Sequence, residues 1–316
     1  MSSRRTIGVD AGGTKLLVGV VDEDFRITNR EQLLWSGERR DQVLDRCAAA
    51  VQRALALAPD AVAVGFGIPA LVEQPSGIAR SSVHLPLDDV PFRELMADRL
   101  AIDVFVDNDA NCALIAEHAA GAAAGCDHAA LLTIGTGIGG GLLLGGKLYR
   151  GANGFGAELG HMVVDHDGAR CFGNCPGVGC LEAVASGSAL ARLGEAAAGR
   201  LPGSALGRAR EGEKLTGISV TEAALAGDAV AIEVVEHAGR RLGAGICGIV
   251  NALNPEVVVV GGGVMALGEL LLGPAREVVL ERALGPSREA VRIVAAAFGE
   301  DAGMVGAATM ALRGGS

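Results

Sequence analysis

The segment from Glu158 to Glu182 carries the densest group of reactive side chains in the sequence, because its two glutamates enclose two histidines and three cysteines. Thiols and imidazoles this close together are typical of a metal site, a redox pair, or a glycine-rich loop that holds thiols by chance; the carboxylates are typical of a substrate site. The chain has seven cysteines, an odd number, and no secretion signal. We therefore expect a reducing cytoplasm, in which a cysteine cluster binds metal rather than forming disulfides.

A second chemical signal is DAGGTK near the N-terminus, where a strand pattern runs into a Gly-Gly turn and a second strand pattern follows. The Walker phosphate loop is excluded, because it requires a different glycine spacing and a helix after the turn. A hairpin tip still presents backbone N–H groups to phosphate oxygens. We predict phosphate contacts from Gly12, Gly13, the Thr14 hydroxyl and the Lys15 ammonium, and a water-mediated Mg²⁺ contact from Asp10. The alternative is a solvent-exposed hairpin turn.

GTGIGG matches the dinucleotide fingerprint G-x-G-x-x-G, but that fingerprint requires a helix after the turn. The segment LLLGGKLYRG that follows is predicted as a strand instead, so we interpret this turn as a second phosphate hairpin, with Thr136 and Gly137 at its tip. Gly262 and Gly263 of VVGGGV are predicted to approach a nucleotide base closely. Together the three loops are expected to surround one ATP.

Hydrophobic periodicity and turn residues predict alternating strands and helices. Ser219 and Glu222 have the spacing of a helix-capping box. The expected elements are a hairpin at 5–22, a helix at 38–58, a strand and Gly/Pro loop at 61–73, a strand at 103–109, a helix at 111–125, a hairpin at 129–151, a long helix at 229–252, a strand and Gly turn at 255–264, and helices at 267–284 and 301–313.

Both halves of the chain begin with a glycine-rich hairpin, which predicts two related α/β domains joined near residues 109–125. The length of 316 residues is sufficient for two domains. We predict a smaller domain over 1–112, completed by the last helix at about 301–316. The larger domain over 113–300 carries the cysteine loop.

Charge and hydropathy exclude several classes of function. The formal net charge is −10 and the basic residues are scattered, so the electrostatic field repels nucleic acid rather than binding it. No apolar run reaches the roughly 20 residues that span a bilayer. We expect a cytoplasmic protein with neither a nucleic-acid partner nor a membrane partner.

Eight motifs follow one another along nearly the whole chain: DAGGTK, GFGIPALVE, DNDANCALIAE, LTIGTGIGGGLLLGGKLYRG, GAELGH, GCLEAVASG, NPEVVVVGGG and EDAGMVGAA. Taken together, they resemble the ROK family of sugar kinases and related repressors, within the actin-like ATPase (ribonuclease H-like) fold. The resemblance implies an enzyme that binds ATP and Mg²⁺ and phosphorylates a hexose at its 6-hydroxyl, with glucose as the first expectation. The alternatives are N-acetylglucosamine, N-acetylmannosamine, mannose or fructose, polyphosphate as the donor, and a non-catalytic sugar sensor. A homodimer or homotetramer is implied as well.

By this resemblance Asp109 is the catalytic base that orients the acceptor hydroxyl and accepts its proton. A helix N-cap is the alternative role of Asp109, and local sequence does not separate it from Asp107. Since carboxylates are good acceptors for sugar hydroxyls, the resemblance also predicts a sugar site. Its members are Asn108, Asp109, Glu158, His161 and Glu182, with weaker contributions from Gly67 and Asn153.

The resemblance also assigns the cysteine cluster to a structural Zn²⁺, whose four ligands close the site. In the family a histidine is followed ten residues later by C-x-C-x₄-C, whereas here three residues instead of one separate Cys171 and Cys175. A disulfide between these two, or inert thiols, are the alternatives, and His166 is a reserve ligand. The predicted ligands are His161, Cys171, Cys175 and Cys180.

Two positions depart from the family pattern, and one rival function is weighed against the kinase. Ala70 stands where a glycine is usual and His84 where an asparagine is common, and both are expected to face the sugar. The rival is a sugar-responsive repressor, which needs a DNA-binding helix-turn-helix before the first hairpin. We expect the kinase, because that hairpin starts at about residue 7.

Overall fold

The computed structural model describes residues 4–35, 38–210, 212 and 214–315. The chain forms two compact units. Unit 1 comprises Met1–Asp127, Gly141–Ala157 and Ala296–Ser316, and unit 2 comprises His128–Gly140 and Glu158–Ala295. The domain boundary predicted after residue 112 stays a prediction. Within the described part of the chain, no helix combines the length and the apolar character that a membrane crossing requires.

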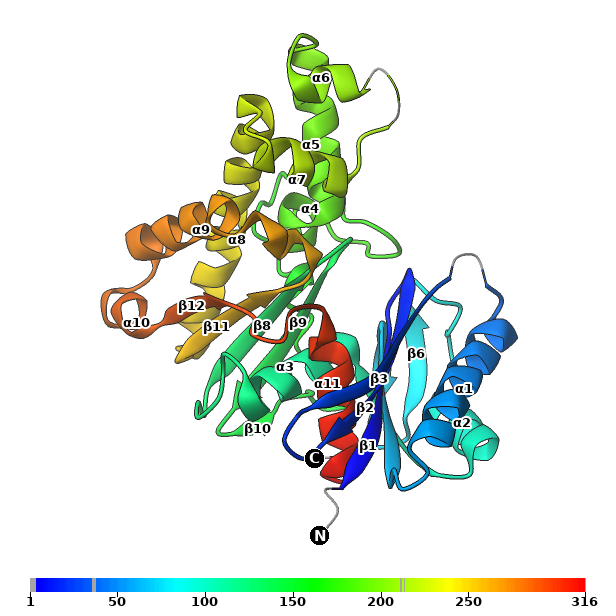
Figure 1. Ribbon diagram of the computed structural model, residues 1–316. Coiled ribbons are helices and arrows are strands. Elements are labelled where there is room, and N and C mark those ends of the chain that lie inside the picture. The colour runs from blue at the N-terminus through cyan, green and yellow to red at the C-terminus, as the bar shows by residue number, and fades with distance from the viewer. Residues whose placement is uncertain (1–3, 36–37, 211, 213, 316) are drawn as a thin grey trace. The chain divides into compact units, whose positions relative to one another are not determined.

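Unit 1 contains two sheets and the helices that cover them (Figure 1). Its elements are β1 (Arg5–Ala11), β2 (Lys15–Asp22), β3 (Ile27–Leu34), α1 (Arg40–Leu57), β4 (Ala63–Ile68), β5 (Ala70–Glu73), β6 (Ile78–Ser82), α2 (Phe92–Leu100), β7 (Asp103–Asn108), α3 (Asp109–Ala120), β10 (Lys147–Leu148), the 3-10 helix η3 (Gly299–Asp301) and α11 (Ala302–Leu312).

The main sheet of unit 1 has the strand order β3-β2-β1-β4-β7. β1 and β2 form the expected antiparallel hairpin, whereas β4 runs parallel to β1 and β7. Side chains alternate between the faces of a strand, so Ile7 and Val9 enter the core beneath α1 while Gly8 lies under α11. A Cβ at Gly8 or Gly65 would overlap a carbonyl oxygen of α11. Glycine at both positions therefore lets this helix lie directly on the sheet, as Figure 1 shows in red.

Unit 2 consists of strands and a larger set of helices. Strand β9 begins in unit 2 and ends in unit 1. The elements are β8 (Ala129–Ile134), β9 (Ile138–Leu144), η1 (Leu159–His161), α4 (Leu181–Ala185), α5 (Gly187–Arg200), α6 (Ala205–Arg210), α7 (Gly217–Leu225), α8 (Ala229–Leu253), β11 (Val257–Gly261), η2 (Gly263–Leu267), α9 (Glu269–Arg282), α10 (Gly285–Ala290) and β12 (Arg292–Ala295).

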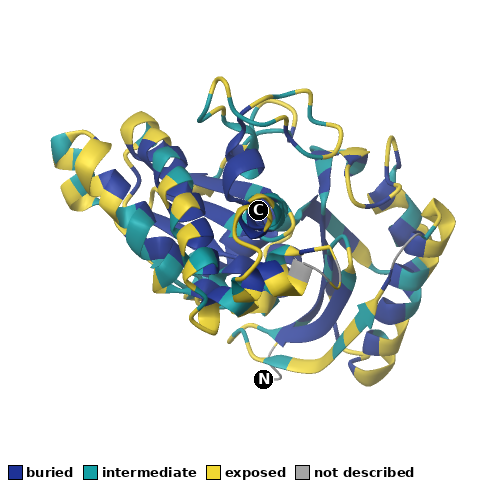
Figure 2. Ribbon diagram, turned by 90° about the horizontal axis from the view of Figure 1, so that it is seen from above, coloured by how far each residue is buried: buried dark blue, intermediate teal, exposed yellow. Residues whose placement is uncertain are grey.

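The second sheet has the order β10-β9-β8-β11-β12, with β11 parallel to β8 and to β12. All five residues of β11 are buried, which explains why its sequence is a continuous apolar run rather than an alternating one. Figure 2 shows the central strands in dark blue, the colour of buried residues, and yellow on the outer turns of the helices. The amphipathic helix α8 packs along α9 and contributes one such outer surface.

Two local predictions were wrong. Ala70–Glu73, expected as part of a loop, forms β5 and pairs with β6. The capping box starts at Thr216 rather than Ser219: the Thr216 hydroxyl accepts from the Ser219 N–H and the Ser219 hydroxyl accepts from the Thr216 N–H. The reason is that Thr216 is itself a favourable N-cap, so α7 begins almost one turn earlier than the Ser219–Glu222 spacing indicated.

Candidate functional site

The first glycine hairpin lies between β1 and β2 and is braced by Trp35, the only tryptophan in the chain. The indole Nε1 donates to the Gly12 carbonyl at 2.9 Å, and the Trp35 backbone N–H donates to the Thr14 carbonyl at 3.2 Å. Gly13 packs against His84, where an added Cβ would come within 2.8 Å of the His84 Cβ. Thr14 is exposed at the tip. Trp35 and His84 thus hold the hairpin in place, while Thr14 at its tip stays exposed.

Asp10 is the half-buried next-to-last residue of β1, and its carboxyl packs against Gly303 in the first turn of α11. The pKa of Asp10 is raised from 3.8 to about 7: desolvation is the largest cause, the charges of Asp109 and Asp301 raise it as well, and the charge of Lys15 lowers it. A bound cation would offset this cost. Mg²⁺ is commonly held by one or two carboxylates together with phosphate oxygens, so the donor set fits this ion.

Asn108 is the N-cap of α3, the role that Asp109 was alternatively expected to fill. The Asn108 side-chain oxygen accepts from the N–H groups of Ala110 and Asn111, at 2.9 and 3.3 Å, and its amide donates to the Ala70 carbonyl. Asp109 is the first residue of the helix, half-buried, with Oδ1 accepting from the Ala110 N–H at 2.8 Å.

Asp107 differs sharply from Asp109, although the two are separated by one residue. It is 1% exposed, and its carboxylate accepts from Arg150 Nε at 2.6 Å, from the Asn111 amide at 2.9 Å and from the Asn108 N–H at 2.7 Å. A general base must reach the proton that it accepts. Asp107 is enclosed and fully engaged, so the geometry favours Asp109 for contact with a substrate.

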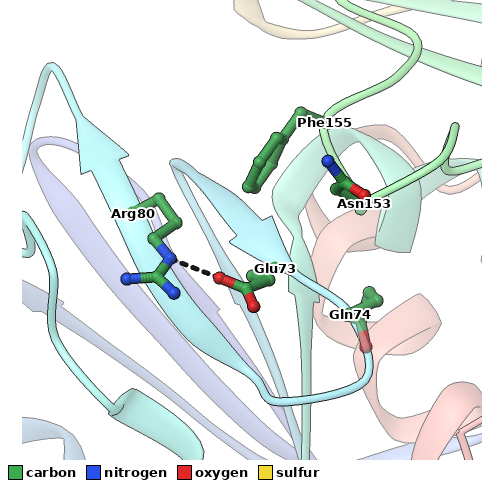
Figure 3. A pocket seen from close by; sticks show the side chains of 5 residues that line it. All are labelled: Glu73, Gln74, Arg80, Asn153 and Phe155. Carbon is green, nitrogen blue, oxygen red and sulfur yellow. Dashed lines mark hydrogen bonds and ion pairs between the residues drawn. The ribbon is translucent and has the colours of Figure 1, made fainter.

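Gly67 and Asn153, the weaker sugar-site candidates, occupy different surroundings in unit 1. Gly67 is buried in β4, where its lack of a side chain admits the first turn of α3. Asn153 lines a pocket of about 490 Å³ with residues that were not predicted, and Figure 3 shows it across from the Glu73–Arg80 ion pair of β5 and β6. The lining residues are Glu73, Gln74, Arg80, Asn153 and Phe155.

In unit 2 the four predicted zinc ligands lie together. Their ligand atoms are all within 4.8 Å of one another, with 3.7 Å from Cys171 Sγ to His161 Nδ1 and 3.9 Å from Cys175 Sγ to Cys180 Sγ. Four ligands arranged tetrahedrally at zinc–sulfur bond lengths lie about 3.8 Å apart, so the donor set fits Zn²⁺. The exposed His166 is outside this group.

The expanded spacing between Cys171 and Cys175 is accommodated by the loop itself. Gly173 adopts a φ of 59°, which turns the chain back. None of the seven cysteines forms a disulfide in the structure, so Cys171 and Cys175 are not bonded to each other. Burial raises the pKa of the Cys171 thiol, and a bound Zn²⁺ would lower it, because metals bind the thiolate.

Two glutamates adjoin the cluster in different ways. Glu158 Oε2 lies 4.0 Å from Nε2 of His161, so the imidazole faces the cysteines with one nitrogen and Glu158 with the other. Desolvation raises the pKa of Glu158, the His161 charge lowers it and the Glu182 charge raises it. Glu182 accepts from the Ile138 N–H at 2.8 Å through Oε2, and its Oε1 lies 3.7 Å from Cys171 Sγ.

The second glycine hairpin lies between β8 and β9, with Thr136 exposed. A Cβ at Gly137 would overlap the Glu182 carboxylate. Gly262 has a φ of 87° and packs against the backbone of Ile134, which is a structural reason for glycine there. An added Cβ at Gly263 would meet only open space, so this position offers the room that a ligand needs.

Trp35 and Arg150 contribute to these sites but were not predicted from the sequence. Their partners are 23 and 43 residues away, so no local pattern reports either contact. The one available signal was that Trp35 is the sole tryptophan and directly follows a strand pattern. Arg150 lies in the motif LTIGTGIGGGLLLGGKLYRG, but nothing in that motif indicates its contact with Asp107.

Comparisons with known proteins agree on one group of relatives. The family model described as the ROK family matches residues 6–313. Glucokinase of Thermotoga maritima is 37% identical over 315 residues, covering 98% of each chain, and glucokinase of Halalkalibacterium halodurans is 34% identical, covering 97% of this chain and 94% of the relative. The crystal structure of a ROK family glucokinase from Streptomyces griseus in complex with glucose and AMPPNP is 34% identical, with a TM-score of 0.86, and covers 98% of this chain and 99% of that chain.

Proposed function

The chain belongs to the ROK family, and from that membership we propose that it is a glucokinase, which transfers the γ-phosphoryl group of ATP to the 6-hydroxyl of glucose. The likeness extends over nearly the whole chain, and the α/β fold is the expected two-domain actin-like ATPase fold. The observation that carries the proposal is that 98% of the chain matches a glucokinase at 37% identity. Within unit 1, the charge of Asp109 also raises the pKa of Asp10, next to the glycine turn, which supports placing the proposed base near the proposed Mg²⁺ site.

The proposed reaction requires alignment and charge neutralisation rather than a covalent intermediate. The 6-oxygen of the sugar forms its bond to the γ-phosphorus while the bond from that phosphorus to the bridging oxygen breaks, and ADP leaves with the electron pair. The hydroxyl proton passes to the Asp109 carboxylate. Lys15 and the hydroxyls of Thr14 and Thr136 would bind the phosphate oxygens. Mg²⁺, when held beside Asp10, would supply charge neutralisation.

Five residues are proposed to bind the sugar. Asn108 and Asp109 belong to unit 1, and Glu158, His161 and Glu182 belong to unit 2. Carboxylates and an imidazole suit the paired donors and acceptors of sugar hydroxyls. Glu182 already accepts from a backbone N–H, so its second oxygen, Oε1, is the one we assign to the sugar.

Zinc would have a structural role in this proposal. Four protein ligands leave no coordination position for substrate, so the metal would fix the loop that carries Glu158 and Glu182 and hold His161 by Nδ1. Thiolates remain ligands only while they are reduced, which supports a cytoplasmic location. We also propose a homodimer or homotetramer without nucleic-acid or membrane partners.

The test is a coupled assay of ADP formation with a panel of hexoses and with ATP or polyphosphate as donor. We expect glucose and ATP to give the highest kcat/KM. Asp109→Asn should lower kcat by about 10³-fold while glucose binding, measured by calorimetry, is retained. Asp98→Asn, the same change at an exposed position of unit 1, should match the wild type. Glucose binding without ADP formation from any hexose would identify a sugar sensor instead.

A further inference from the structure

Glu117 is a fully buried carboxylate that the reaction described above does not use. It is 0% exposed, and its oxygens accept three backbone N–H groups: Oε2 from Ala122 at 2.8 Å and from Ala297 at 3.0 Å, and Oε1 from Phe298 at 2.9 Å. Gly121 packs so closely that a side chain there would overlap the carboxylate. Such a group is costly to bury and is retained only when its hydrogen bonds are complete.

The segment that Glu117 holds is followed at once by η3, which contacts the first glycine hairpin. The chain re-enters unit 1 at Ala296, and η3 follows immediately after Phe298. Glu300 of η3 forms an ion pair of 3.3 Å with Lys15 at the hairpin, and the charge of Asp301 acts on Asp10. The Lys15–Glu300 and Arg30–Asp301 ion pairs are partly solvent-exposed, and exposed pairs contribute little to rigidity. The position of the segment reaches the hairpin through close packing, because the Asp10 carboxyl lies against Gly303 directly after it. The hydrogen bonds of Glu117 are the buried attachment of the segment to α3.

Glu117 stands on the same helix as the proposed base. Asp109 begins α3, and Glu117 follows two turns later on that helix. We propose that Glu117 is a positioning residue, which fixes the segment 297–301 to α3 and thereby holds the phosphate hairpin at a set distance from Asp109. The inference rests on the proposed kinase function, because it assigns Glu117 to the alignment of the phosphoryl donor with the base.

A carboxylate is suited to this position because every group facing it is a donor. In Glu117→Gln the amide keeps one accepting oxygen, but its NH₂ group faces a backbone N–H. In Glu117→Ala all three N–H groups lose their partner. The loss of hydrogen bonds to the segment should therefore be smaller in Glu117→Gln than in Glu117→Ala. Transfer steps are sensitive to alignment at the scale of 1 Å, so the loss should appear in the rate and in the response to ATP.

The experiment compares steady-state kinetics and amide hydrogen exchange of the full chain. Glu117→Ala should lower kcat/KM for ATP by about 30-fold, with Gln in between, and should leave KM for glucose within about twofold. The peptide covering 296–303 should exchange faster than in the wild type. Phe92→Leu is the control: it loosens the buried Phe66–Phe92 contact in the same unit and should lower the thermal midpoint without either change.

Each outcome decides the proposal. Unchanged kcat/KM for ATP in Glu117→Ala, or faster exchange spread evenly over unit 1, would show that Glu117 only stabilises the fold. If Glu117→Ala does not fold, the Gln variant is measured for the same two readouts. Amide hydrogen exchange can be measured whether or not the protein is active. If the wild type forms no ADP with any hexose, the kinase proposal is contradicted. The exchange rate of the peptide 296–303 would still test whether Glu117 attaches this segment.

Discussion

The two glycine hairpins look alike locally but are braced by different means. Each joins two strands through a glycine turn and exposes a threonine, Thr14 in unit 1 and Thr136 in unit 2. The first is held by the Trp35 indole, whereas the second is held by the Glu182 carboxylate. The local sequence thus forms each turn, whereas the side chain that holds the turn in place comes from a residue distant in the sequence.

The brace determines what each hairpin is coupled to. In unit 2 the N–H groups of Gly187 and Ser188, at the start of α5, also donate to the carbonyls of Gly135 and Thr136 at 2.8 and 3.2 Å. Glu182 joins this arrangement to the metal-ligand cluster, because its other oxygen lies beside Cys171. Disturbing the cluster should therefore reach the second hairpin, whereas the first hairpin should respond to changes within unit 1.

The largest effect is expected from Glu182→Ala, which removes the brace of the second hairpin and a proposed sugar ligand together. We expect kcat/KM to fall by about 10³-fold, equivalent to about 4 kcal/mol. Glu182→Gln retains an oxygen facing the Ile138 N–H and should preserve KM for ATP better than Ala does. Steady-state kinetics with each substrate varied in turn measure the difference. Equal KM values for ATP in the two variants would show that the Glu182 side chain does not brace the second hairpin.

Loss of the proposed zinc should have the next largest effect, because it would destabilise the loop of unit 2 that carries Glu158 and Glu182. Cys175→Ser removes one ligand, and we expect loss of bound zinc and of about 3 kcal/mol of the free energy of unfolding. KM for glucose should rise more than KM for ATP. Metal analysis and thermal unfolding check the result. The control is Cys247→Ser on α8, the same substitution in the same unit; zinc loss there too would argue against a local site.

The contrast between the hairpins also shows what a sequence can predict. The hairpins themselves, the long helix α8 and the apolar strand β11 follow from local periodicity, and the structure confirms them. Thr216 is the N-cap of α7, although Ser219 was expected in that role. Both residue types are suitable N-caps and the two lie within one turn, so local spacing does not distinguish between them. The separation of Asp107 from Asp109 depends on Arg150, 43 residues away from Asp107, and long-range partners leave no local pattern.

A smaller effect is expected from the charge at the first hairpin. The folded-state pKa of Asp10, about 7, exceeds its ordinary value of 3.8, so the folded protein binds a proton more tightly than the unfolded chain does. The resulting stabilisation is complete below the lower pKa and is lost as the pH rises through the higher one. After allowance for partial exposure, this loss is on the order of 2 kcal/mol.

Asp10→Asn should remove that pH dependence. Without nucleotide or Mg²⁺, the variant should be more stable than the wild type at about pH 8, while its kcat with ATP falls. Denaturant unfolding between about pH 4 and pH 8 measures the first effect, and the ADP assay measures the second. Asp22→Asn, at the far end of β2, is the control in the same sheet. A wild type whose stability rises through this range more steeply than that of the variant would contradict the raised pKa.

Trp35→Phe should produce the smallest change and isolates a single hydrogen bond. The ring still fills the buried site, but the donor to the Gly12 carbonyl is lost, while the backbone contact to Thr14 remains. One hydrogen bond contributes about 1 kcal/mol, so KM for ATP should rise by about fivefold with kcat and KM for glucose nearly unchanged. Trp35→Leu, which loses the aromatic packing as well, should exceed this effect. If Phe and Leu raised KM for ATP equally, packing rather than the indole N–H would be the brace, and the two hairpins would differ less than their hydrogen bonds indicate.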